Sequence, residues 1–121
     1  MKLITAIIQP DKLDDVKTSL GEAGIEGLTV SDVQGYGKQA GFTQVFHDTE
    51  YKINLRRKIK IEIFIPKESV EKAISAILKG AKTNSGSIGD GKIIVTNIED
   101  ELRIHRCILN PLVLPFEKVY N

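Results

Sequence analysis

Apolar residues in this chain alternate between strand spacing and helix spacing, in the order strand, helix, strand, twice over. Runs rich in Ile, Val and Thr indicate strands, and apolar residues three or four apart indicate helices. A polar stretch separates the two units, which is typical of the split βαβ arrangement. The pattern predicts an α+β, ferredoxin-like fold, a four-stranded antiparallel sheet with two helices on one face. We expect strands at residues 3–9, 28–34, 58–65 and 92–97, and helices at residues 12–23 and 68–78.

The other face of that sheet has no covering layer in a single copy of the chain. We assign Ile7, Ile61, Ile63 and Ile65 to one parity of their strands, while the opposite parity also carries Ile or Phe. Apolar residues on both faces of a sheet indicate that both faces are buried. We therefore expect further copies of the chain to cover the second face in an oligomer.

Length and charge limit the class of protein. The chain has 121 residues, which fits one domain over residues 1–121. Its net charge of +1 gives no general electrostatic reason to expect nucleic acid or an anionic membrane as a partner. No apolar run approaches the ~20 residues that span a bilayer, and the one cysteine, Cys107, cannot form an internal disulfide. We expect a cytoplasmic protein without direct membrane insertion.

Residues 86–92 hold three glycines, one carboxylate and one lysine directly before the last expected strand. Glycine lets backbone N–H groups crowd around a bound anion, and Lys92 supplies a positive charge beside them. The spacing differs from that of a Walker loop, and no helix follows. From this run alone, a phosphate loop at residues 82–91 and a polar hairpin loop are equally good interpretations.

The polar stretch at residues 37–57 is a second unusual feature. Structureless loops of about twenty residues are uncommon in compact domains and are usually functional or disordered. This one carries amides, carboxylates, basic residues and Tyr51. We interpret it as an arm that probes a partner and that ligands order, with a flexible insertion as the alternative.

Several motifs in order resemble one known family. From Met1 to about Arg103 the chain is similar to the P-II nitrogen-regulatory signal-transduction proteins. The motifs are Ile-Ile-x-Pro-x-Lys-Leu-Asp-Asp-Val at residues 7–16, Gly-Leu-Thr-Val at 27–30, Gly-Tyr-Gly-Lys-Gln at 35–39, Glu-Tyr at 50–51, Lys-Ile-Lys-Ile-Glu-Ile at 58–63 and Ile-Gly-Asp-Gly-Lys at 88–92.

The resemblance implies a homotrimeric sensor and not an enzyme. ATP or ADP would bind in the clefts between subunits, and 2-oxoglutarate would join ATP and Mg²⁺. The long effector loop, residues 37–57, would respond by docking on an ammonium transporter, a metabolic enzyme or a regulator.

The resemblance also assigns roles to individual residues. Arg103 would reach the phosphates from the neighbouring subunit, Gln39 would help to ligate Mg²⁺, and Tyr51 matches a tyrosine that some members modify. The 2-oxoglutarate residues would be Gln39, Gly41 and Lys58. The nucleotide residues would be Thr29, Gly35, Gly37, Lys38, Gln39, Glu62, Gly89, Asp90, Gly91, Lys92 and Arg103.

The chain departs from the family pattern at several places. The stretch before Ile88 is two residues longer than usual, Gln9 replaces a frequent lysine, and the tail at residues 104–121 diverges. His105 stands where a second basic residue is usual, and imidazole is neutral over much of the physiological range. This predicts a shift in preference from ATP toward ADP.

Other functions remain open at this level. One is slow nucleotide hydrolysis, with Asp90 and Glu62 as the candidate carboxylates, although no Ser-His pair or paired-carboxylate spacing supports it. Another is a related sensor of ADP or AMP with bicarbonate. An RNA-binding or metal-binding module is disfavoured because the strands lack a stacking aromatic pair and the His and Cys residues form no ligand cluster.

Overall fold

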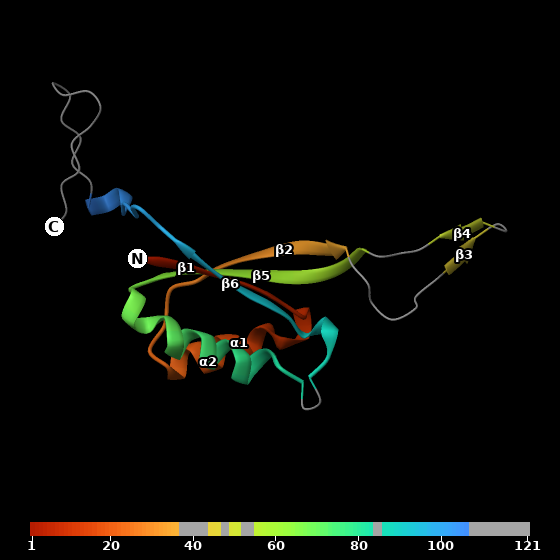
Figure 1. The fold of residues 1–121 in the computed structure, drawn as a ribbon, viewed down its shortest axis with the longest axis horizontal. Helices are drawn as coiled ribbons and strands as arrows, with labels where there is room; N and C mark the ends of the chain where they lie inside the picture. Colours follow the sequence, from red (N-terminus) through yellow and green to blue (C-terminus); the bar gives the residue numbers. More distant parts are fainter. Residues whose placement is uncertain (37–43, 47–48, 52–54, 84–85, 107–121) are drawn as a thin grey trace, which may run out of the picture.

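The computed structural model describes residues 1–36, 44–46, 49–51, 55–83 and 86–106. Within them, four strands form one antiparallel sheet in the spatial order β2-β5-β1-β6, and two helices lie on one of its faces (Figure 1). The predicted ferredoxin-like fold is therefore confirmed. The elements are β1 (Lys2–Ile8), α1 (Leu13–Glu22), β2 (Thr29–Tyr36), β5 (Leu55–Ile65), α2 (Val70–Ala81) and β6 (Gly91–Asn97).

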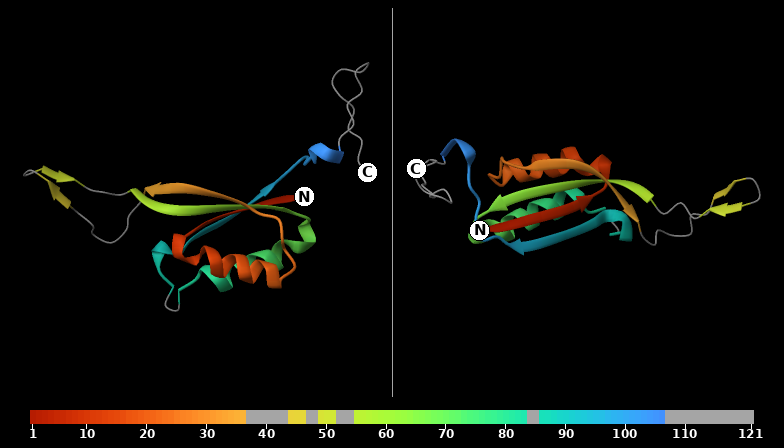
Figure 2. Two further views of the ribbon diagram at one scale, coloured as in Figure 1. Left: turned by 180° about the vertical axis from the view of Figure 1, so that it is seen from behind. Right: turned by 90° about the horizontal axis from the view of Figure 1, so that it is seen from above.

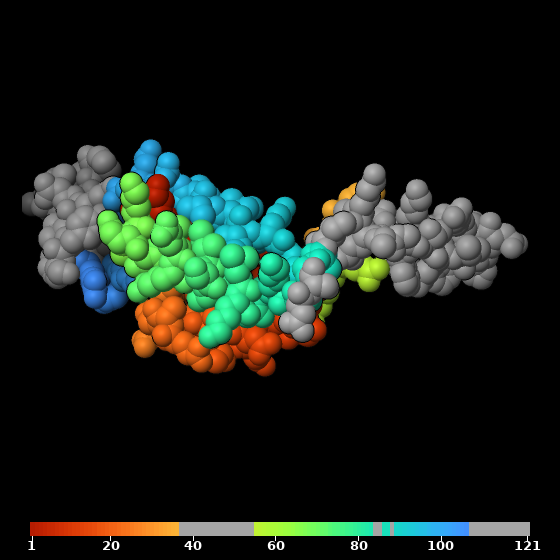
Figure 3. Space-filling view, turned by 60° about the horizontal axis from the view of Figure 1, so that its bottom comes forward, coloured from red at the N-terminus to blue at the C-terminus, as the bar shows by residue number. Residues whose placement is uncertain are grey.

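The core lies between the sheet and the two helices. Alternate residues of β1 and β5 face the helices, and opposite residues such as Ile4 and Ile63 pair across the ladder and are fully buried. The helices pack closely at Gly80, where an added Cβ would lie 2.7 Å from the Cα of Val16. Figure 3 shows α1 and α2 side by side on the outer surface of the helix layer. The buried apolar side chains that form the core are Ile4, Ala6, Ile8, Val16, Leu20, Ile25, Ile59, Ile61, Ile63, Ile65, Ala73, Ala76, Ile77 and Ala81.

The opposite face of the sheet carries apolar residues that no described helix covers (Figure 2). Phe64 and Ile94 are 43% and 45% exposed, and Ile7 lies half-buried beside them on the same parity. Our grouping of Ile7 with Ile61 was wrong, because the register pairs Ile7 with Lys60 and sets both on the open face. The expectation of apolar groups on both faces nevertheless holds.

The stretch at residues 37–57 contains more regular structure than the sequence predicts. Strands β3 (Gln44–Phe46) and β4 (Thr49–Tyr51) pair antiparallel within it. Strand β5 begins at Leu55, so the expected loop boundary at residue 57 was wrong by three residues. The ladder extends because Tyr36 still pairs with Leu55, and Arg57 forms a 2.9 Å ion pair with Asp32 on the same side of the two strands.

Candidate functional site at the two ends of the sheet

The glycine-rich loop before β6 is shaped by the carboxylate of Asp90. One oxygen, Oδ2, accepts hydrogen bonds from the N–H and hydroxyl of Thr83, both at 3.0 Å, and from the N–H of Ser87 at 3.2 Å. The Ser87 hydroxyl donates to Oδ1 at 3.1 Å. These hydrogen bonds hold the pKa of Asp90 below its usual value, and the one from the N–H of Thr83 contributes most. Asp90 is thus engaged in building the loop.

Gly91 fixes the point where this loop enters β6. Its φ of +115° lies in a region that side chains rarely adopt. A Cβ there would lie 1.7 Å from the carbonyl oxygen of Ile7. The loop therefore approaches the end of β1 more closely than any other residue type would allow. Lys92 follows as an exposed residue paired with Ile7 in the β1–β6 ladder.

A buried lysine meets the loop at the carbonyl of Gly89. The Lys58 ammonium donates to this oxygen at 3.0 Å, and the side-chain amide of Gln9 donates to the same oxygen at 2.6 Å. Lys58 is only 8% exposed. Burial, reinforced by the charge of Arg56 and opposed by Asp90, lowers the pKa of Lys58.

No carboxylate in the described part of the chain lies within 4.0 Å of the Lys58 ammonium. Asp90 acts on this ammonium only from a longer distance, and a buried cation that no carboxylate contacts is costly, so this position favours an anion. Gly35 lies against the stem of the same lysine, because a Cβ on Gly35 would lie 3.5 Å from the Lys58 Cγ. The structure thus brings together Gly35, Lys58 and Gly89, three residues that the resemblance assigns to ligand sites, and adds Gln9.

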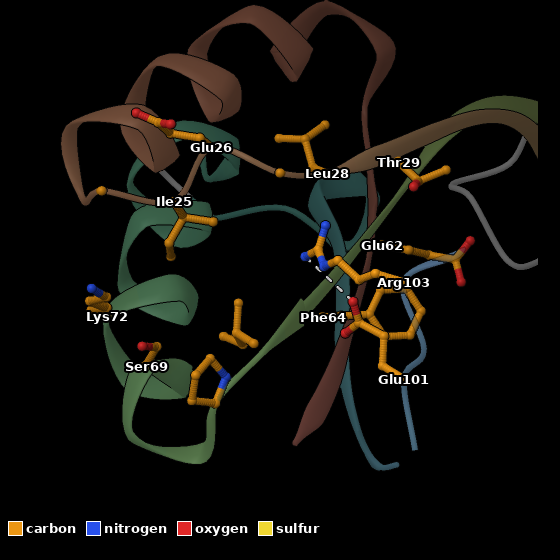
Figure 4. A pocket seen from close by; sticks show the side chains of 14 residues that line it. Ile25, Glu26, Leu28, Thr29, Glu62, Phe64, Ser69, Lys72, Glu101 and Arg103 are labelled. Carbon is orange, nitrogen blue, oxygen red and sulfur yellow. Dashed lines mark ion pairs between the residues drawn. The ribbon is translucent and has the colours of Figure 1, made fainter. Parts of the chain in front are cut away.

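The second group of predicted residues lies at the opposite end of β2 and β5. Thr29 and Glu62 are direct partners in the β2–β5 ladder. Both line a pocket of about 400 Å³ with Phe64, Glu101 and Arg103 (Figure 4). Arg103 Nη2 lies 3.5 Å from Glu101 Oε1, and Lys60 Nζ lies 3.8 Å from Glu62 Oε1. Neither Phe64 nor Glu101 carries a sequence signal that would have placed it here.

These two groups lie apart within one chain. Lys58 and Glu62 are four residues apart on β5, which corresponds to about 13 Å along a strand. One group holds the glycine loop and Lys58, and the other holds the pocket with Arg103. Within one chain, the candidate residues therefore form two separate contact regions along β5.

Several predicted residues lie outside the described part of the chain. They include Gly37, Lys38, Gln39 and Gly41, which carry the expected Mg²⁺ ligand and part of the effector site. Tyr51 is the last residue of β4, but its side chain is not described. Among the described residues there is no group of three or more His, Cys, Asp or Glu side chains that could hold a metal ion. None of the described helices is both long and apolar enough to cross a membrane.

Sequence comparison agrees with this class of fold. The family model described as Nitrogen regulatory protein P-II matches residues 1–106. The nitrogen regulatory protein P-II of Mesorhizobium japonicum is 50% identical over 104 residues, which cover 86% of this chain and 91% of that protein. Those of Rhizobium etli and Haemophilus influenzae are 49% and 45% identical over the same shares. The chain therefore belongs to the P-II family, whose members named here are nitrogen regulatory proteins.

Proposed function

We propose that this chain is a non-catalytic signal-transduction sensor. It binds ATP or ADP, takes up 2-oxoglutarate in the presence of Mg²⁺ and ATP, and controls a target through residues 37–57. The observation that carries this proposal is the buried Lys58 ammonium, which donates to the Gly89 carbonyl and has no described carboxylate partner. A dicarboxylate beside it would supply the missing negative charge.

The nucleotide site in this proposal forms between two copies of the chain. One copy contributes Gly35, the backbone of residues 89–91 and Lys92. A second copy contributes Thr29, Glu62 and Arg103 from the other end of its sheet. The family resemblance places Arg103 on the neighbouring subunit, and the apolar open face gives the copies a surface to bury. The assembly is a homotrimer, as the family resemblance implies.

The remaining parts of the proposal come from the family resemblance. Lys38 meets the phosphates, Gln39 helps to ligate Mg²⁺, and Gln39 and Gly41 meet 2-oxoglutarate with Lys58. Tyr51 is the proposed site of modification. Because ATP and 2-oxoglutarate are intracellular metabolites, the sensor acts in the cytoplasm, on a target such as an ammonium transporter or an enzyme of nitrogen or carbon metabolism.

Titration calorimetry tests the proposal directly. The protein is titrated with ATP, ADP and AMP, each with and without 2-oxoglutarate and Mg²⁺. We expect micromolar binding of ATP or ADP, and binding of 2-oxoglutarate that depends on ATP and is lost in Lys58→Ala. Lys60→Ala is the matched control, since Lys60 lies on the same face of β5 but already faces Glu62. An effector response unchanged in Lys58→Ala would contradict the assignment.

Asp90 has no catalytic role in this proposal. Its carboxylate accepts four hydrogen bonds from Thr83 and Ser87, and its lowered pKa makes it a poor base. Nucleotide turnover by the pure protein that disappears in Asp90→Asn would show otherwise.

A further inference from the structure

Glu101 occupies an unusual position in the pocket with Arg103 (Figure 4). Its Oε1 lies 3.5 Å from Arg103 Nη2. Its other oxygen, Oε2, is buried and has no hydrogen-bond partner within the described residues. The Glu101 side chain is 21% exposed, whereas that of Arg103 is 61% exposed. Among the described residues, this carboxylate, which is mostly removed from water, is therefore held by one long ion pair.

The charges around this pocket do not suit a polyanion as they stand. The pocket is lined by three carboxylates and two cations, so it carries one more negative than positive charge. The carboxylates are Glu26, Glu62 and Glu101, and the cations are Lys72 and Arg103. Removing the charge of Glu101 would balance the pocket. It would also leave Arg103 without this carboxylate partner.

Carboxylate and phosphate oxygens compete for the same guanidinium donors. We propose that Glu101 is a specificity-determining residue, which competes with nucleotide phosphates for Arg103 and lowers affinity for phosphate-bearing ligands relative to the bare nucleoside. This inference rests on the proposed function, in which Arg103 reaches the phosphates. It predicts that Glu101 weakens binding, the opposite of what a ligand-contacting residue does.

A stabilising role does not account for this pair. Ion pairs with one well-exposed partner contribute little to stability, and the buried Oε2 without a donor opposes the folded state. The position is therefore better explained by its effect on Arg103 than by the fold.

The experiment compares ATP, ADP and adenosine binding to wild type, Glu101→Gln and Glu99→Gln. Glu99 is exposed two residues away, so its variant makes the same change in net charge without touching the pocket. We expect Glu101→Gln to bind ATP and ADP about two- to five-fold more tightly at low salt, with the gain shrinking as salt is added. Adenosine affinity stays unchanged, because adenosine has no phosphate for Arg103. Glu101→Ala, which also removes the buried oxygen, changes affinity in the same direction.

The outcomes separate this inference from the proposed function. A wild type that binds ATP, with a Glu101→Gln variant that binds it equally or more weakly, overturns the role of Glu101 alone. The same holds if Glu99→Gln tightens binding as much, or if adenosine gains as much as ATP. A wild type that binds none of the three ligands overturns both proposals.

Discussion

Replacing Lys58 with methionine distinguishes an anion-binding lysine from a structural one. The substitution keeps the apolar stem of a residue that is 8% exposed and removes its charge. The lost contact is one charge-assisted hydrogen bond, which contributes about 1.5–3 kcal/mol. Against it stands the desolvation of the ammonium, which lowers its pKa and offsets part or all of that hydrogen bond. We therefore expect the free energy of unfolding of ligand-free Lys58→Met to be unchanged or raised by up to about 2 kcal/mol.

The shared acceptor makes this prediction sharper. The carbonyl of Gly89 accepts from both Lys58 and Gln9, so either single variant leaves it one donor. The double variant Gln9→Leu with Lys58→Met leaves it none. A half-buried carbonyl without a donor costs about 1–3 kcal/mol, so the double variant should be less stable than the sum of the singles by at least about 1 kcal/mol.

Urea denaturation of the ligand-free proteins measures both effects. It is run at several protein concentrations, because subunit dissociation would add to the apparent stability. Lys60→Met is the control, and its long, half-exposed pair with Glu62 predicts a change within about 0.5 kcal/mol. A loss of more than about 2 kcal/mol in Lys58→Met, or strict additivity in the double variant, would refute the reasoning.

Three further predictions concern the loop and the tail. Asp90→Asn should speed hydrogen exchange of the Thr83 and Ser87 amides, which donate to this carboxylate. Because the pKa of Asp90 is lowered in the fold, the slower exchange of the wild type is fully present above about pH 4 and is lost as the pH falls through the pKa of the folded state. Gly91→Ala should lower the free energy of unfolding by more than about 2 kcal/mol, since its Cβ would overlap the Ile7 carbonyl, and an undiminished melting temperature would contradict this. His105→Arg should tighten ATP more than ADP in calorimetry, and an equal gain for both would remove the explanation we give for an ADP preference.

The sequence predicted the order of the elements but not every boundary or face. Alternation alone located β1, yet it could not decide which parity of β1 faces the helices, because Ile occurs on both. The start of β5 was missed since Arg56 and Arg57 look like loop residues. Their pairing with the end of β2 depends on the register, which only the folded sheet sets.

Two contacts of the candidate site involve residues that the sequence motifs already single out. The need for glycine at residue 91 and the approach of Gly35 to Lys58 are consistent with the motif-based assignment. The contact of Gln9 with Gly89 joins residues 80 positions apart, so no local pattern could reveal it. Glu101 was missed because the pocket it lines is built mainly by residues far from it in sequence, such as Thr29 and Phe64.

The two groups of candidate residues, one around Lys58 and the other around Glu62, are joined by strand β5, which has a consequence for signalling. Between Lys58 and Glu62 this strand is buried on its helix side through Ile59 and Ile61 and is hydrogen-bonded on both edges, to β1 and β2. Such a segment is among the most rigid in a small domain, so the two ends cannot shift much relative to each other within one chain. In the proposed trimer, the nucleotide would instead join the glycine loop of one copy to the Arg103 pocket of the next. Under this proposal, coupling between nucleotide and effector would pass through the loop at Gly89, which Lys58 and Gln9 contact, and not along the sheet.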